Sequence, residues 1–144
     1  MVVEPREFPA GTRTAADAAA AIGVTLGQIV KALVFLVDGS PVVALVAGHN
    51  LLDEGRLAAA AGGVAATRPD AARVREATGY PIGGVPPFGH SRPLPVYVDE
   101  DLLRHAELWA AAGTPRVNFA IAPHALVAAT AGEVAALRRD DTPM

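Results

Sequence analysis

Lys31 is the residue whose type and position best suit chemistry in this chain. It is the one lysine among twelve basic residues, in a composition that otherwise uses arginine. An ammonium group is a compact point charge that can hold a phosphate or a ribose without the planar fork of a guanidinium. The structural alternative is a lysine whose stem lies along the edge of an apolar strand. Its uniqueness favours the functional interpretation.

A second candidate is the segment of residues 79–95, which holds too much glycine and proline for a helix or a central strand. It carries Tyr80, Val85 and Phe88, which prefer burial, so we expect it to fold against the core. Glycines such as Gly83 and Gly84 expose main-chain N–H and C=O groups and let a ligand approach closely. We therefore predict a small pocket here. A plain surface loop is the alternative.

Other kinds of catalytic site are poorly supported. Ser40 and Ser91 lack the glycine elbow of a serine nucleophile. The four histidines have no metal-ligand spacing, so we expect no metal and no other cofactor. The acidic residues at 53–54 and 99–101 stand where helices begin, and capping explains them better than a carboxylate pair. The chain has no cysteine, which excludes thiolate chemistry and fits a reducing compartment.

Length and composition describe one soluble domain over residues 1–144. The apolar runs are too short to cross a bilayer and no secretory signal is recognisable, so we expect a cytoplasmic protein with no membrane contact. The net charge of −3 argues against a protein that coats nucleic acid, although contact with a short RNA end remains allowed. For such contact the candidates are Arg68, Arg73 and Arg75, with a solvated helix face paired to Glu76 as the alternative.

The elements that position these residues follow from caps, turns and apolar patterns. We expect helices over residues 15–22, 54–61, 70–77 and from 123 onward, with a short helix over 100–105. Strands are expected at 30–37 and 41–47, joined by the Asp38-Gly39 turn, and at 94–98, 108–112 and 117–122. This order predicts an α+β domain with a curved, mainly antiparallel sheet flanked by helices.

Several motifs together resemble the YbaK and prolyl-tRNA synthetase-associated editing domains over about residues 14–137. They are the segment 28–35 around Lys31, Thr-Gly-Tyr at 78–80, Gly-Gly-Val-Pro-Pro-Phe-Gly at 83–89, Val-Asp at 98–99 and Ala-Gly-Thr-Pro at 112–115. Asp53 and Leu57 in the second expected helix complete the pattern. The order and spacing of these motifs make the resemblance specific.

The resemblance implies an aminoacyl-tRNA deacylase that hydrolyses mischarged tRNA, commonly proline tRNA carrying alanine or cysteine. Lys31 matches the family lysine that holds the terminal adenosine, and Gly83 with Pro87 matches a Gly-x-x-x-Pro motif that lines the aminoacyl pocket. The implied catalytic residues are Lys31, Gly83 and Gly84. The implied substrate-binding residues are Lys31, Tyr80, Gly83, Gly84, Val85, Pro87, Gly113 and Thr114. The implied partners are the acceptor end of aminoacyl-tRNA and prolyl-tRNA synthetase.

Two departures from the family concern selectivity and the second helix: Pro86 stands where many relatives have serine, and Arg56 where many have lysine. No catalytic triad is required, because an aminoacyl ester is already activated and needs mainly positioning of the ester, the ribose hydroxyl and one water. A free-standing editing hydrolase is the first hypothesis. A noncatalytic module that binds an amino acid or nucleotide, and an accessory subunit of a synthetase, are the alternatives.

Overall fold

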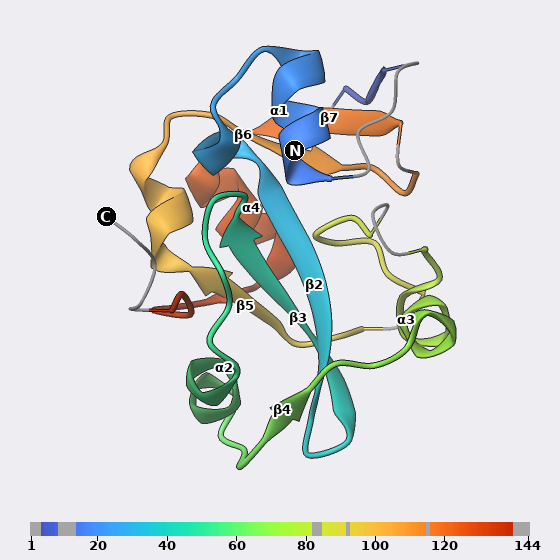
Figure 1. The fold of residues 1–144 in the computed structure, drawn as a ribbon, viewed down its shortest axis with the longest axis vertical. Helices are drawn as coiled ribbons and strands as arrows, with labels where there is room; N and C mark the ends of the chain where they lie inside the picture. Colours follow the sequence, from blue (N-terminus) through green and yellow to red (C-terminus); the bar gives the residue numbers. More distant parts are fainter. Residues whose placement is uncertain (1–3, 9–13, 82–84, 92, 115, 140–144) are drawn as a thin grey trace.

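The computed structural model in Figure 1 describes residues 4–8, 14–81, 85–91, 93–114 and 116–139. The strands are β1 (Arg6–Glu7), β2 (Val30–Val37), β3 (Ser40–Ala47), β4 (Ala66–Thr67), β5 (Val96–Asp99), β6 (Leu108–Ala111), β7 (Val117–Ile121) and β8 (Glu133–Ala135). The α-helices are α1 (Ala15–Ile22), α2 (Glu54–Ala60), α3 (Ala71–Thr78) and α4 (Pro123–Thr130). Two 3₁₀-helices, η1 (Leu26–Gln28) and η2 (Glu100–Arg104), complete the described elements.

The predicted α+β class is confirmed, and the described strands are divided between two sheets. A five-stranded sheet has the order β4-β2-β3-β5-β8, and a three-stranded sheet has the order β1-β7-β6. Strand β2 pairs antiparallel with β3 and β4, whereas β3–β5 and β5–β8 are parallel. The small sheet is antiparallel throughout. Pairing is therefore mainly antiparallel, as predicted.

Local capping explains where three of the helices begin. In each, the side chain of the residue before the helix accepts a hydrogen bond from the main-chain N–H three residues later, at 2.8–3.0 Å. These capping residues are Thr14, Asp53 and Asp70. Gly79 ends α3 with a φ of +84°, a conformation that glycine adopts without strain. The boundaries at Thr14, Asp53 and Gly79 confirm the sequence predictions. Asp70 was predicted to lie inside its helix and instead caps it.

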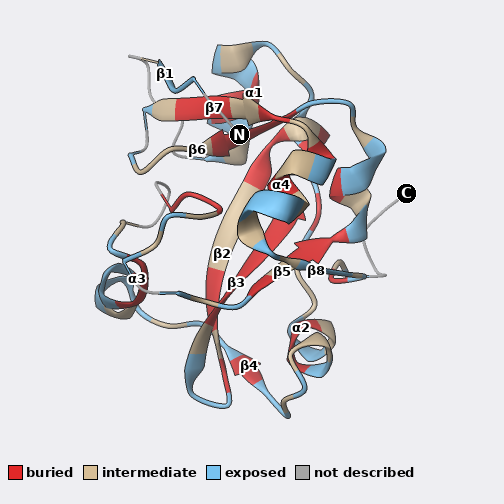
Figure 2. Cartoon of the chain, turned by 180° about the vertical axis from the view of Figure 1, so that it is seen from behind, coloured by how far each residue is buried: buried red, intermediate tan, exposed pale blue. Residues whose placement is uncertain are grey.

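Strand β3 forms the centre of the large sheet and is buried from Val42 to Ala47 (Figure 2). Its odd residues, such as Val43 and Leu45, pack in one cluster with Leu126 of α4 and residues of the small sheet. Its even residues, such as Ala44, pack with Leu57 of α2 in a second cluster. Because both faces of the strand are covered, the sequence shows a continuous apolar run instead of an alternation.

Strand β2 is paired unevenly, and this defines the site. Its inner edge pairs with β3 along the whole strand. Its outer edge contacts β4 only at Leu36 and Val37, and an isolated parallel bridge joins Ile29 to Trp109 of β6. Between these two contacts no strand among the described residues pairs with the outer edge of β2.

Some expected boundaries and one capping role differ from the structure. Strand β5 begins at Val96 and not at residue 94, because Pro93 and Pro95 have no N–H to donate to a ladder. The prediction that Asp99 caps the following helix is wrong. Its side chain makes no capping bond, and its Oδ1 instead accepts from the N–H of Leu137 at 2.8 Å. None of the helices in the described part of the chain has the length and apolar character of a membrane span.

Candidate functional site

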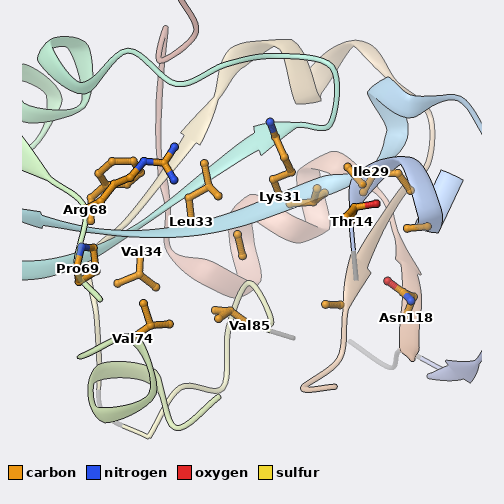
Figure 3. Close-up of a pocket in the computed structure, with 16 residues that line it drawn as sticks. Thr14, Ile29, Lys31, Leu33, Val34, Arg68, Pro69, Val74, Val85 and Asn118 are labelled. Atoms are coloured by element: carbon orange, nitrogen blue, oxygen red, sulfur yellow. The ribbon is translucent and has the colours of Figure 1, made fainter. Parts of the chain in front are cut away.

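A cavity of about 370 Å³ lies beside β2 (Figure 3). All residues from 30 to 35 line it, together with residues of α1, α3, β6, β7 and the segments next to α3. Side chains of consecutive strand residues point to opposite faces. A cavity that touches both sets therefore lies against the edge of the strand and extends over both of its faces.

Two cations lie on one side of this cavity (Figure 3). Lys31 extends from β2 and is half-buried. Arg68, which follows β4, places its guanidinium 5.4 Å from the ring centroid of buried Phe35. This cation–π contact holds Arg68 over the same face of β2 that carries Lys31.

The ammonium group of Lys31 is held in place by a main-chain acceptor. Its Nζ donates a hydrogen bond to the main-chain oxygen of Asn50, in the loop after β3. Burial lowers the pKa of Lys31, and the positive charge of nearby Arg68 lowers it further. An ammonium has three donors, and the bond to Asn50 uses one of them.

Asn50 is itself fixed by a buried polar network. It is 3% exposed, and its Nδ2 donates to Asp99 Oδ2 at 3.3 Å and to Asp101 Oδ2 at 2.8 Å. Asp99 is fully buried and also binds the N–H of Leu137. The loop that holds Lys31 is thus connected to the end of β5 and to the C-terminal segment.

The other side of the cavity is apolar. Val34, Val74 and Val85 are 5–8% exposed and pack against one another, with Ala32 and Tyr80 beside them. They come from β2, from α3 and from the segment after residue 84. The predicted folding of this glycine- and proline-rich segment against the core is confirmed for Val85.

The described part of that segment, residues 85–91, is anchored to α3 by main-chain and side-chain bonds. Tyr80 Oη donates to the main-chain oxygen of Gly89 at 3.1 Å, and Ser91 N–H donates to the main-chain oxygen of Thr78 at 2.9 Å. His90 Nε2 lies 2.7 Å from the main-chain oxygen of Pro86. Burial lowers the pKa of His90, although this contact acts in the opposite direction.

Residues 9–129 match the family described as the aminoacyl-tRNA editing domain. The chain belongs to this family. Two proteins of similar length resemble this editing domain. The first is YwhH of Bacillus subtilis, an uncharacterized protein, which is 32% identical over 83% of this chain and 76% of its own. The second is EbsC of Enterococcus faecalis, provisionally named a Cys-tRNA(Pro)/Cys-tRNA(Cys) deacylase, at 30% identity over 85% and 75%.

The editing domain also resembles part of a larger enzyme and two solved structures. Proline–tRNA ligase of Maridesulfovibrio salexigens is 34% identical over 70% of this chain, which corresponds to 17% of the ligase. A crystal structure described provisionally as a trans-editing enzyme for prolyl tRNA synthetase has a TM-score of 0.89 and 48% identity, covering 95% of this chain and 87% of its own. Hypothetical protein APE2540 has a TM-score of 0.89 at 31% identity, over 96% and 93% of the two chains.

The editing domain brings four of the predicted site residues close to the cavity. Lys31 and Val85 line it. Tyr80 packs beside Val85, and a Cβ built on Gly113 would lie 3.0 Å from Cε1 of Tyr80. The φ of Gly113 is +105°, so both the backbone and the neighbouring ring disfavour a side chain there.

The remaining predicted residues are placed differently or are not described. Pro87 is buried but is not among the residues that line the cavity. Thr114 is exposed, and its Oγ1 accepts from the N–H of Arg116 in a turn. Gly83 and Gly84 lie outside the described residues. The functional roles of all these residues remain predictions.

Sequence reasoning missed several residues that contribute to the site. Asn118, 3% exposed, lines the cavity from β7, and one polar residue in an otherwise apolar strand was a usable signal. Asn50 gave no signal, because its partners are distant in sequence. The three candidate arginines lie in different places: Arg68 lines the cavity, Arg73 pairs with Glu76 at 2.8 Å on α3, and Arg75 is exposed on the same helix. Within the described residues no cluster of acidic or histidine side chains could hold a metal ion.

Proposed function

We propose that this chain is a free-standing trans-editing hydrolase that removes a small, wrongly attached amino acid from proline tRNA. The observation that carries the proposal is the cavity beside β2, in a chain of the aminoacyl-tRNA editing family. One side offers Lys31 and Arg68, and the other offers a wall of three valines. This pairing suits a ligand with a phosphate-bearing nucleoside at one end and a small apolar side chain at the other.

The proposed reaction is ester hydrolysis without a covalent enzyme intermediate. The oxygen of a water forms a bond with the ester carbonyl carbon, and the bond from that carbon to the ribose oxygen breaks. The ribose oxygen leaves with a proton that derives from the water, which yields the free amino acid and uncharged tRNA. Lys31 would hold the terminal ribose or phosphate, and the vicinal ribose hydroxyl would position the water. Arrangement of these groups, instead of a side-chain nucleophile, accounts for the rate.

The size of the cavity supports a small substrate side chain. Its volume of about 370 Å³ lies near the lower end of the usual range of about 300–1,000 Å³ for small-molecule pockets. The side chains of Val34, Val74 and Val85 offer no polar group that would bind a larger polar side chain. A synthetase rejects amino acids smaller than its own only weakly, so a second, smaller site is the expected complement. Alanine and cysteine fit this description better than proline.

The acceptor end has a further place to bind beside Arg68. A second cavity of about 370 Å³ borders the start of α2, and Arg68 and Arg139 both line it. Arg68 thus stands between the two cavities. Phosphates that precede the terminal nucleotide would pass this side of the molecule, where the positive charges of Arg68 and Arg139 border the second cavity and would attract them.

A deacylation screen tests the proposal. Purified protein is incubated with alanyl, cysteinyl, seryl, threonyl and prolyl esters of proline tRNA, and with alanyl ester of one unrelated tRNA. We expect fast release of alanine or cysteine and no release of proline. Ligand binding without turnover would support the noncatalytic module, and activity that appears only with an added synthetase would support the accessory subunit. Absence of hydrolysis of every small ester under all of these conditions would contradict the proposal.

A further inference from the structure

The cavity lies against the open edge of β2, and the main chain there is placed to bind a ligand. Residues 30–35 all line the cavity although their side chains alternate between the two faces of the sheet. The shared feature of these residues is the outer edge. Between the bridge at Ile29 and the β4 pairing at Leu36, no strand in the described part of the chain occupies it.

Two hydrogen bonds establish which main-chain groups face the cavity. Gly48 N–H donates to the oxygen of Ile29 at 2.8 Å, so odd-numbered residues of β2 direct their N–H and C=O groups toward β3. Asp38 N–H donates to the oxygen of Ala65 at 2.9 Å on the outer side, so even-numbered residues face outward. Both ends of the strand give the same alternation. The N–H and C=O groups of Ala32 and Val34 therefore point to the cavity side.

This edge separates the two chemically different sides of the cavity. Lys31, with Arg68 over Phe35, lies on one face of β2. Val34, with Val85 behind it, lies on the other face. In an aminoacyl nucleoside the ester and the α-ammonium group lie between the ribose and the amino-acid side chain. A ligand that spans both sides must bring these two groups to the edge, next to Ala32 and Val34.

We infer that the main chain of Ala32 and Val34 binds the part of the ligand common to all amino acids. The N–H groups donate to the ester carbonyl oxygen, and the C=O groups accept from the α-ammonium group. The inference rests on the proposed function and names the groups that act in its site. Because the carbonyl oxygen gains negative charge when water adds, N–H donors placed there also favour hydrolysis. Recognition by main chain leaves the valine wall to select the side chain.

Amide hydrogen exchange measured by NMR on the full chain tests this assignment residue by residue. The ligand is 3′-alanylamino-3′-deoxyadenosine, in which an amide replaces the labile ester. In the free protein we expect the amides of Ala32 and Val34 to exchange roughly tenfold or more faster than those of Leu33 and Phe35, which pair with β3. With saturating ligand the exchange of Ala32 and Val34 should slow by roughly tenfold or more, while that of Leu33 and Phe35 changes little.

A matched ligand isolates the role of the carbonyl groups. The 3′-propionylamino analogue has the same size but lacks the α-amino group. It should bind roughly tenfold or more weakly at neutral pH, because a hydrogen bond to a charged group is lost. It should still protect the two amides once the protein is saturated. Equal affinity of the two ligands would overturn the assignment of the C=O groups.

The outcomes separate this inference from the proposed function. Deacylation of alanyl-tRNA, together with ligand that binds without slowing exchange at Ala32 and Val34, would refute the inference and leave the function standing. Slow exchange at both amides in the free protein would also refute it, since the edge would then already be paired. Absence of both ligand binding and deacylation would refute both.

Discussion

Lys31 has an environment that differs from that of an exposed lysine. Its stem follows β2, its Nζ binds the main-chain oxygen of Asn50, and burial with nearby Arg68 lowers its pKa. The folded state therefore binds this proton less tightly than the unfolded state. It follows that stability rises with pH between the lowered pKa and the ordinary one, and that the charged form costs stability below that window. The proposed role of Lys31 is therefore contact with a ligand, because its charged form does not stabilise the fold.

Replacement of Lys31 tests this interpretation. Lys31→Ala should reduce deacylation by about tenfold to a hundredfold, the equivalent of one hydrogen bond to a charged group. The free energy of unfolding should change by no more than about 1 kcal/mol. Lys31→Arg should restore little activity, because a longer planar cation displaces the ester. Single-turnover hydrolysis and urea denaturation provide the two readouts. Full activity of Lys31→Ala would refute the role, and full rescue by arginine would show that only the charge matters.

The pH dependence of ligand binding tests the coupling between Lys31 and Arg68. With the propionylamino analogue, which has no titrating amine, affinity should fall as pH rises through the pKa of Lys31, below the range of an ordinary lysine. Arg68→Met removes a neighbouring positive charge, so the pKa rises and the fall moves to higher pH. Arg75→Met, at an exposed position of α3, is the matched control and should leave the profile in place. An unmoved profile in Arg68→Met would contradict the coupling.

At the scale of elements, the valine wall depends on three segments that meet at one place. Strand β2 contributes Val34, α3 contributes Val74, and the segment after residue 84 contributes Val85. Gly79 ends α3 and allows the chain to turn. The hydrogen bond from Tyr80 to the main-chain oxygen of Gly89 holds the segment after residue 84 next to Tyr80. The width of the wall is therefore a property of the segment's conformation, and a change at Val85 should alter selectivity before it alters chemistry.

Val85→Ala tests the wall. The variant should hydrolyse larger aminoacyl esters of proline tRNA better relative to alanyl ester, by roughly tenfold or more, since each methylene in an apolar pocket contributes about 1–3 kcal/mol. Loss of two buried methyl groups should lower the free energy of unfolding by about 2 kcal/mol. Val64→Ala, at a position that is 90% exposed, is the control and should change neither quantity. An unchanged ratio between the esters would move side-chain selection elsewhere.

Sequence patterns predicted the elements well where the cause is local. Thr14 and Asp53 each cap the helix that begins at the next residue, and Asp38-Gly39 closes a hairpin, so short-range chemistry is sufficient. The strands β4 and β8 were not predicted, because they are two and three residues long and exist only through pairing with β2 and β5. The same distance effect hid the contacts of Asn50 with carboxylates about fifty residues away.

For the candidate site, the sequence predicted Lys31 and the burial of Val85 but not their arrangement. The amino-acid sequence alone shows a lysine in an apolar run and apolar residues in a glycine-rich segment. The sequence does not show the open edge of β2, because that edge depends on where β4 and β6 stop pairing with β2. Arg68 was one of three arginines named as candidates for phosphate contact. Its position at the cavity and its cation–π contact with Phe35 distinguish it from the other two, and both depend on the fold.

At the scale of the whole molecule, the net charge of −3 argues against broad nucleic-acid binding, so we expect contact with tRNA to involve few cations. Arg68 and Arg139 line the second cavity. Arg139→Gln should raise the KM for alanyl-tRNA several-fold and leave the affinity for 3′-alanylamino-3′-deoxyadenosine unchanged, because that ligand lacks the preceding phosphates. The slope of affinity against salt should become shallower by about one unit. Arg75→Gln serves as the control. Equal losses of affinity for tRNA and for the nucleoside ligand in Arg139→Gln would contradict contact between Arg139 and the preceding phosphates.

The proposed function is hydrolysis of the ester that joins a small amino acid to tRNA, with prolyl ester left intact. The most direct measurement is the single-turnover rate constant for alanyl-tRNA and prolyl-tRNA, both on proline tRNA, with protein in excess and spontaneous hydrolysis subtracted. We expect alanine release to be at least about a hundredfold faster than proline release, the discrimination that a small apolar pocket can provide. Release of neither amino acid above the spontaneous rate, or release of both at the same rate, would contradict it.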